Sequence, residues 1–393
     1  MKRNLMLGLI AAGVIFSFPL AAGAQGNLHL GKLEIHPGVS VGYTYSDNIN
    51  WLADSNKALD QNPEENILQV SPGVDLRFPT SHHLFRLGYN LSAFDLQKRK
   101  QTKYKNSAMG AVDLNFPVGL VVRLSDNYTE RLFPTLQMPD QSGIVEYWIN
   151  DTFAEVGYKL ASRWSAAGRY KNDMLRVQDR PRHDRDISSW GGAIFLRVIT
   201  WLSLFGEGWY GHVGYKEAAS GDSNADFGRG FLGLAGNYPK TKFTLKVGYD
   251  HWTYRKSTAL PDANELVAAL ELEGKPTPGL SVSVHGSRSV EVTFYEGSPI
   301  YVSTGGGADL TWVLFRKLAI GADLGYYAQE YIHINYAGVK RKDEITQVSP
   351  SVKYEITRWL RAQAGYIWRN RSSNVESAEF KENRVGASLN AVF

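Results

Sequence analysis

The sequence contains no cysteine, and after residue 24 it has no apolar run long enough to form a transmembrane helix. Without cysteine, neither disulfide bonds nor thiolate chemistry can stabilise or operate the protein. The formal net charge is only +4, from 43 basic and 39 acidic residues spread along the chain, so no nucleic-acid role is expected. Glycine, with 38 residues, and aromatic residues, at 12%, are abundant instead. This mixture is typical of curved strands bounded by aromatic girdles.

The N-terminus has the features of an export signal. Lys2 and Arg3 precede an apolar run over residues 5–20, and Ala22-Gly23-Ala24 follows as a small-residue cleavage pattern. The alternative is an N-terminal anchor helix, but the run is short for a membrane span, contains Pro19 and is followed by no stop-transfer charges. The sequence therefore predicts that residues 1–24 are a signal peptide.

Residues 25–393 show apolar and polar residues in alternation, in segments bounded by turn residues. Every second residue is apolar from Tyr89 to Ala93, from Phe243 to Tyr249 and from Leu318 to Tyr326. A period of two indicates strands with one face toward lipid and one toward water, whereas a helix needs a period of 3.6.

Such segments are centred near eighteen positions: Val41, Val70, Tyr89, Val112, Val122, Val156, Gly168, Ile194, Gly206, Leu234, Val247, Ala269, Val284, Ala308, Leu324, Val352, Ala364 and Ala387. In hydrocarbon every backbone N–H and C=O must be paired, so the sheet has to close. We predict an all-β fold: one domain, residues 25–393, forming a transmembrane antiparallel up-and-down β-barrel of about 18 strands with both termini periplasmic. That width leaves a water-filled lumen.

The connections alternate between short turns, such as residues 117–119 and 275–279, and longer polar stretches, such as residues 130–143 and 172–186. This pattern predicts periplasmic turns and extracellular loops. The densest charge cluster lies in one long stretch and supplies a candidate basic extracellular loop: Arg176, Arg180, Arg182 and Arg185. It could constrict the lumen or bind a receptor, or it could be a solvated loop that attracts polyanions non-specifically.

The last strand alternates up to the final residue, Phe393. A terminal aromatic residue on the lipid face resembles the insertion signal of outer-membrane barrels, and the alternative is an ordinary edge strand that ends in phenylalanine by chance.

The inner face predicted by this alternation carries charges of both signs. Its candidate lumen-lining residues are Arg77, Arg86, Arg123, Arg169, Arg197, Trp209, Lys246, Glu271, Asp323, Tyr327 and Arg361. They could form a selectivity surface for polar or anionic cargo, or self-neutralising ladders that stiffen and wet the wall. The aromatic residues that could stack on sugars are Trp148, Trp190, Trp209, Tyr210, Trp252, Tyr327 and Trp368. Most of them are expected in the girdles at the two interfaces, and only Trp209 and Tyr327 fall on the predicted inner face.

No catalytic constellation is evident. The sequence has no compact serine, histidine and acid motif, no phosphate-binding or dinucleotide-binding loop and no zinc spacing, and His82-His83 lies in a turn. We predict no enzyme activity, no catalytic residues, no cofactor and no bound metal.

Several segments resemble a family of β-barrel porins, the porin 2 type, often associated with exopolysaccharide secretion loci. They are His36-Pro37-Gly38-Val39-Ser40-Val41-Gly42-Tyr43-Thr44-Tyr45-Ser46-Asp47-Asn48, residues 70–76, 348–354 and 357–360, and Ala364-Gly365-Tyr366 with residues 370–374. The resemblance covers the whole mature chain. It implies polysaccharide export or solute diffusion across the outer membrane, and it supplies no catalytic or ligand residues.

The first functional hypothesis is therefore an outer-membrane channel for polar solutes, with a secreted exopolysaccharide as the expected cargo. Its expected partners are outer-membrane lipid, the barrel-assembly machinery, periplasmic polysaccharide-export proteins and the polysaccharide itself. The second hypothesis is a structural or adhesive barrel whose lumen is blocked and whose loops bind partners. A third, a barrel enzyme that modifies lipid or glycan, would need clustered catalytic side chains at one rim.

Overall fold

The computed structural model describes residues 28–53, 63–133, 145–217, 223–255, 260–293, 298–333 and 338–393. The predicted signal peptide, residues 1–24, lies outside the described residues. Among the described residues, no helix is both long enough and apolar enough to cross a membrane.

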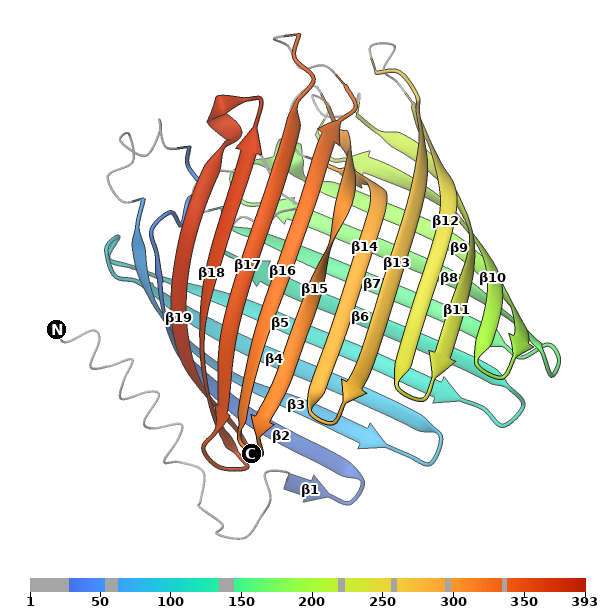
Figure 1. The fold of residues 1–393 in the computed structure, drawn as a ribbon, viewed down its shortest axis with the longest axis horizontal. Helices are drawn as coiled ribbons and strands as arrows, with labels where there is room; N and C mark the ends of the chain where they lie inside the picture. The colour runs from blue at the N-terminus through green and yellow to red at the C-terminus, as the bar shows by residue number, and fades with distance from the viewer. Residues whose placement is uncertain are drawn as a thin grey trace.

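Eighteen strands, β2 to β19, form a closed antiparallel barrel in which each strand pairs with the next along the chain (Figure 1). They are β2 (Leu33–Ser46), β3 (Glu65–Pro79), β4 (His83–Leu96), β5 (Gln101–Asn115), β6 (Leu120–Arg131), β7 (Tyr147–Tyr158), β8 (Trp164–Val177), β9 (Arg185–Ile199), β10 (Leu202–Tyr215), β11 (Ala225–Tyr238), β12 (Thr241–Tyr254), β13 (Ala263–Thr277), β14 (Leu280–Val292), β15 (Ile300–Phe315), β16 (Leu318–Tyr331), β17 (Lys342–Glu355), β18 (Leu360–Ser373) and β19 (Phe380–Val392). The predicted fold class is confirmed, and every predicted centre lies in its own strand.

The barrel closes where β19 pairs with β2, from Arg384 opposite Ser46 to Val392 opposite Gly38. The backbone N–H of Phe393 continues this seam by donating to the carbonyl oxygen of Pro37 over 2.9 Å. Closure leaves no unpaired edge in the wall, as a hydrocarbon environment requires. A short extra strand, β1 (Leu28–Leu30), pairs with the start of β2 beyond the seam. Because eighteen is even, β2 begins and β19 ends at the same rim, and the periplasmic position of that rim stays a prediction.

Side chains alternate between the two faces of the wall. The outer face exposes large apolar residues on almost every strand, for example Tyr89, Trp190 and Leu232, and Leu232 is 72% exposed. Exposed apolar surface on this scale is stable only against lipid. On the same three strands Arg86, Arg197 and Arg229 have the opposite parity and so lie on the other face.

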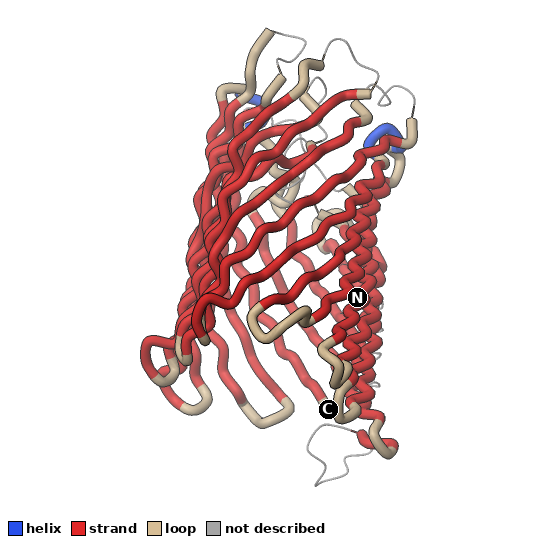
Figure 2. Tube along the Cα trace, turned by 90° about the vertical axis from the view of Figure 1, so that its right-hand side faces the viewer, coloured by secondary structure: helices blue, strands red, loops and turns tan. Residues whose placement is uncertain are grey.

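One rim carries short turns and the other carries the longer connections (Figure 2). Gly119 and Gly279 close two of the short turns with φ of +86° and +89°, in the left-handed region that favours glycine. At the other rim the strands run further than predicted. Arg176 belongs to β8 and Arg185 to β9, so only Arg180 and Arg182 lie in the connection, beside a short 3-10 helix, η1 (Pro181–His183). The predicted loop was too long because strands of 12–16 residues exceed the roughly ten needed to span a membrane.

Candidate functional site

A row of ion pairs crosses the inner wall from β6 to β12. Arg123 Nη1 lies 2.6 Å from Glu155 Oε1, and Arg169 Nε lies 2.7 Å from Glu155 Oε2. Arg169 Nη1 then reaches Glu207 Oε2 at 2.8 Å, and Lys246 Nζ reaches Glu207 Oε1 at 3.3 Å. The structure thus brings three of the sequence-predicted residues, Arg123, Arg169 and Lys246, into one network with alternating charges.

The row reaches over intervening strands because small residues stand between its members. The link from Arg169 to Glu207 passes over β9, where Gly191 is the register partner of Arg169. A Cβ at Gly191 would lie 2.4 Å from the ring of Trp209, so only glycine allows the indole to lie flat against the wall. This aromatic-over-glycine packing is a recognised device of barrel sheets.

Basic side chains cover the aromatic rings of the same wall. Lys171 Nζ lies 4.8 Å from the ring centre of Trp209, and Lys246 Nζ lies 4.3 Å from that of Phe231. Arg229 lies over Phe227 at 5.7 Å and pairs with Asp250. This wall therefore presents cations that rest on aromatic rings.

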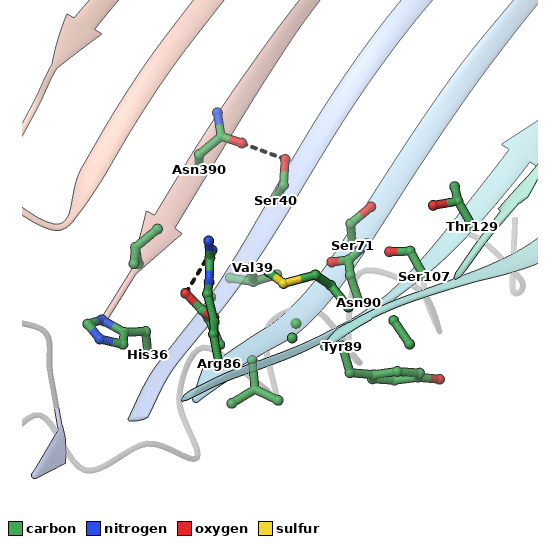
Figure 3. A pocket seen from close by; sticks show the side chains of 18 of the residues that line it. His36, Val39, Ser40, Ser71, Arg86, Tyr89, Asn90, Ser107, Thr129 and Asn390 are labelled. Atoms are coloured by element: carbon green, nitrogen blue, oxygen red, sulfur yellow. Dashed lines mark hydrogen bonds and ion pairs between the residues drawn. The ribbon is translucent and has the colours of Figure 1, made fainter. Parts of the chain in front are cut away.

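A second cluster lies on β19 and on β2 to β6, around a cavity of about 620 Å³ (Figure 3). At one end Asp75 pairs with Arg86, at 2.9 Å between Oδ1 and Nε, and with Arg77, at 2.6 Å between Oδ2 and Nη2. The rest of the lining mixes hydroxyl and amide groups with glycine and apolar side chains, and Ser40 donates to Asn390 Oδ1 over 2.7 Å, as drawn in the figure. The structure thus joins the predicted residues Arg77 and Arg86 through one carboxylate.

A third network follows β16 to β19. Gln347 Nε2 donates to Asp323 Oδ1 over 2.9 Å, and Arg369 Nη2 donates to Gln347 Oε1 over 2.7 Å. Arg369 Nη1 lies 3.0 Å from Glu382 Oε2, and Glu382 is fully buried. Nearby, the hydroxyl of Tyr327 lies 3.0 Å from Nε2 of His285 on β14.

Three predicted residues stay apart from these networks. Arg197, Glu271 and Arg361 are exposed side chains nearer the short-turn rim. Arg361 Nη2 is 3.4 Å from Glu355 Oε1 on the neighbouring strand. No hydrogen bond or ion pair within the described residues joins any of the three to Arg169, Asp75 or Asp323.

The long-connection rim is narrowed by residues that fold inward after β2. Trp51 is only 4% exposed and stacks on Phe380 of β19, with ring centres 4.9 Å apart and planes 5° from parallel. Arg369 covers the Trp51 ring at 4.9 Å, and Trp51 Nε1 donates to Glu382 Oε2 over 3.1 Å. The φ of Trp51 is +53°, a costly conformation for a bulky residue. We call residues 48–53 the mouth strap.

At this rim the end of β14 also separates from β13: the two strands pair no further than Ala268 opposite Arg288, whereas β14 stays paired with β15 up to Val292. Tyr215 of β10 donates its hydroxyl to the carbonyl of Thr293 over 3.4 Å, although β11 to β13 separate β10 from β14 in the sheet. Val290 and Ile300 are buried in the same apolar cluster as Phe227 and Trp252.

This cluster corrects the assignment of Trp252 to a girdle. Trp252 is 2% exposed, lies on the face of β12 that carries Lys246 and Asp250, and stacks on Phe227 at 4.8 Å. Its parity with Lys246 could have revealed this face from the sequence. No sequence signal marked Trp51, because it lies in a connection where no periodicity applies.

The basic connection between β8 and β9 encloses a buried histidine. Burial, and then the positive charges of Arg182, Arg180 and Arg185, lower the pKa of His183 to about 4. The histidine is therefore neutral at neutral pH. Arg176 of β8 pairs with Asp186 of β9 at 2.6 Å, so this part of the predicted basic loop is neutralised by an ion pair between two strands.

Comparison with known proteins identifies the C-terminal half of the chain. Residues 197–393 match the family model described as "Putative beta-barrel porin 2". No curated protein matches the chain.

Among solved structures, the outer membrane protein opdK from Pseudomonas aeruginosa superposes with a TM-score of 0.51 at 7% identity, covering 91% of this chain and 99% of that one. A BenF-like porin from Pseudomonas fluorescens Pf-5 superposes with a TM-score of 0.50 at 11% identity, covering 92% and 99%. At these identities the likeness concerns the fold.

Proposed function

Because the chain belongs to the putative beta-barrel porin 2 family, we propose that it is an open outer-membrane channel for polar solutes. Its location in the outer membrane and its porin-like barrel follow from the family and the eighteen-strand wall. Porins are channels rather than enzymes.

The observation that carries the proposal is the inner wall itself. The row from Arg123 to Lys246 and the network from Asp323 to Glu382 place charged groups on both sides of the barrel interior. A wall of this width lined by ion pairs favours water and hydrated solutes over lipids. We propose that all eleven sequence-predicted positions named above line this lumen.

Conductance in a planar lipid bilayer tests the channel. The refolded protein, checked by its heat-modifiable migration on gels, is expected to give stepwise ohmic currents in potassium chloride. A protein that inserts with native migration and never conducts would contradict the proposal.

For the cargo, we infer a polyhydroxylated solute such as a secreted exopolysaccharide. The family resemblance supports this inference, as does the cavity of Figure 3, where side chains such as Ser40, Ser71, Asn90 and Asn390 offer paired donors and acceptors to sugar hydroxyls. Neutral oligosaccharides added to one side of the bilayer should interrupt the current transiently. The double variant Ser40→Ala, Asn390→Leu should shorten these interruptions, whereas current noise that no oligosaccharide changes would argue against a sugar cargo.

The same proposal includes the route to the membrane. We infer that residues 1–24 are removed as a signal peptide and that residues 25–393 form a single barrel domain. Both termini of the mature chain would then face the periplasm, and the barrel-assembly machinery would recognise Phe393. Periplasmic polysaccharide-export proteins are the partners expected for an export channel. Tag accessibility in intact and permeabilised cells tests the position of the termini.

A second candidate is a structural or adhesive barrel with a blocked lumen. The mouth strap favours it, as does the apolar cluster that Val290 and Ile300 form with Phe227 and Trp252, because both put apolar side chains at the long-connection rim. This candidate predicts no current from the wild-type protein and measurable current once the strap is released.

A further inference from the structure

Most charged groups at mid-barrel are neutralised by a partner. Arg123, Arg169 and Lys246 share the carboxylates of Glu155 and Glu207. Arg229 pairs with Asp250, and Arg369 with Glu382. A wall whose charges are all paired attracts water into the lumen, but it exerts little net electric field on a passing solute. Any unpaired charge in it therefore has a disproportionate effect.

Lys171 is such a charge. It lies two residues from Arg169 on the same face of β8, and its side chain is exposed. Within the described part of the chain, no carboxylate oxygen lies within 4.0 Å of its Nζ. Its contacts are the rings of Trp209 at 4.8 Å and Phe153 at 6.0 Å.

The rings hold this ammonium in place without neutralising it. Trp209 cannot move toward the wall, because it already lies against the backbone at Gly191. A cation–π contact attracts the ammonium to the ring face and leaves its other hydrogen-bond donors free. Lys171 is therefore a fixed positive charge with vacant donors directed away from the ring.

Unpaired negative charge lies on a distant part of the wall. Asp309 of β15 and Asp323 of β16 are register partners, and no cation of the described residues lies within 4.0 Å of either. Counting around the barrel from β8, these strands are seven and eight places away among eighteen, so they lie nearly opposite Lys171.

We propose that Lys171 is the anion-binding subsite of the lumen, taking a carboxylate, sulfate or phosphate group of a passing solute and setting the preference of the channel for anions. This inference deepens the proposed function: its role in the selectivity of transport depends on the barrel being an open channel. Binding at Lys171 itself requires only that small anions reach the lumen from either rim.

The first test is ion selectivity. Reversal potentials of wild type and Lys171→Gln are measured under a potassium chloride gradient, and the chloride-to-potassium permeability ratio is expected to fall at least about twofold. One unit charge about 5 Å away changes local anion concentration about fourfold in water before averaging over the lumen. Asp309→Asn should move the ratio in the opposite direction.

Two matched variants separate the site from general charge. Lys246→Gln removes a lumen cation that is paired with Glu207, and it should shift the ratio less than Lys171→Gln does. Lys342→Gln removes an exposed cation paired with Glu330 at the long-connection rim, and it should leave the ratio unchanged. Equal shifts for Lys171→Gln and Lys246→Gln would overturn the proposal, because net charge alone would then explain selectivity.

The second test does not need current. Iodide quenching of the Trp209 fluorescence, obtained as the difference between wild type and Trp209→Phe in detergent, should weaken at least about twofold when Lys171 becomes glutamine. Unchanged quenching would refute the anion subsite whether or not the barrel conducts. Absence of current from the wild type, with this quenching difference preserved, would refute only the channel.

Discussion

Replacing Trp51 with alanine should release the mouth strap and increase single-channel conductance. The indole is fixed by three contacts: stacking on Phe380, the guanidinium of Arg369 over its ring, and the hydrogen bond from its Nε1 to Glu382. All three are lost in the variant, and the left-handed backbone at this position keeps its strain, because alanine is no better suited to a φ of +53° than tryptophan.

The size of the effect follows from these contacts. An aromatic pair contributes about 0.5–1.5 kcal/mol, a cation–π contact about 0.5–2 kcal/mol, and a hydrogen bond to a charged group about 1.5–3 kcal/mol. Their total agrees with the roughly 3–5 kcal/mol that truncating a buried tryptophan removes. A loss of about 3 kcal/mol changes the ratio of docked to released strap roughly a hundredfold.

Two assays report this change. Hydrogen exchange should accelerate at the amide of Leu52, which donates to Asn48 Oδ1 over 3.0 Å in the docked strap. Planar-bilayer recordings should show larger or longer openings. Trp51→Phe keeps the stacking and should fall between wild type and alanine.

Trp359→Ala is the matched control, because it removes a tryptophan that stacks on Phe393 at the short-turn rim. It should leave exchange at Leu52 and the size of the conductance step unchanged. If Trp51→Ala conducts like wild type and its strap exchanges no faster, the strap is not what narrows the mouth.

Three further changes test other parts of the structure. Gly191→Val should push Trp209 off the wall, destabilise the barrel by about 1–3 kcal/mol and lower its conductance. Gly192→Val is the control and should have little effect, because the nearest contact of a Cβ there would be an ordinary 3.5 Å. Equal behaviour of the two variants in bilayers and in denaturant would refute the close-packing argument. Acidification should loosen the connection between β8 and β9, because the pKa of His183 is lowered to about 4 in the folded state. Between the ordinary pKa of 6.5 and about 4, only the opened connection takes up a proton. The closed connection therefore loses stability as the pH falls through this window, by about 2 kcal/mol at pH 5. Hydrogen exchange of residues 178–184 at pH 7 and pH 5 measures this effect, which His183→Asn should abolish. Deleting Phe393 removes the stacking on Trp359 and the last bond of the seam, and should lower the yield of heat-modifiable barrel in cells, with Val392→Ala as a control that leaves both contacts in place.

The sequence predicted the strands and their two faces because both are local properties. A period of two places the side chains of Tyr89 and Arg86 on opposite faces whatever their neighbours are. The positions of the turns followed from residues such as Gly119 and Gly279, whose left-handed φ is encoded by glycine itself. The number of strands, and with it the closed fold, then follows from counting segments.

The partners of the inner charges could not be predicted in the same way. Arg169 reaches Glu207 over β9, and Glu207 meets Lys246 over β11, so each contact depends on register across three strands and on small residues between. The sequence therefore named Arg169 and Lys246 as inner residues without indicating that they share the carboxylate of Glu207. Nor did it indicate that Lys171 lies between two rings with no carboxylate partner among the described residues.

With Trp252 as an exception, the sequence by itself separated the two faces of the strands, because strand geometry alternates from one residue to the next. Only the tertiary structure decided what narrows the mouth, because Trp51 lies in a connection and the end of β14 separates from β13, where that alternation no longer controls direction. Their positions result from packing against strands distant in the chain, such as Trp51 on Phe380, and contacts of that kind exist only once the barrel has closed.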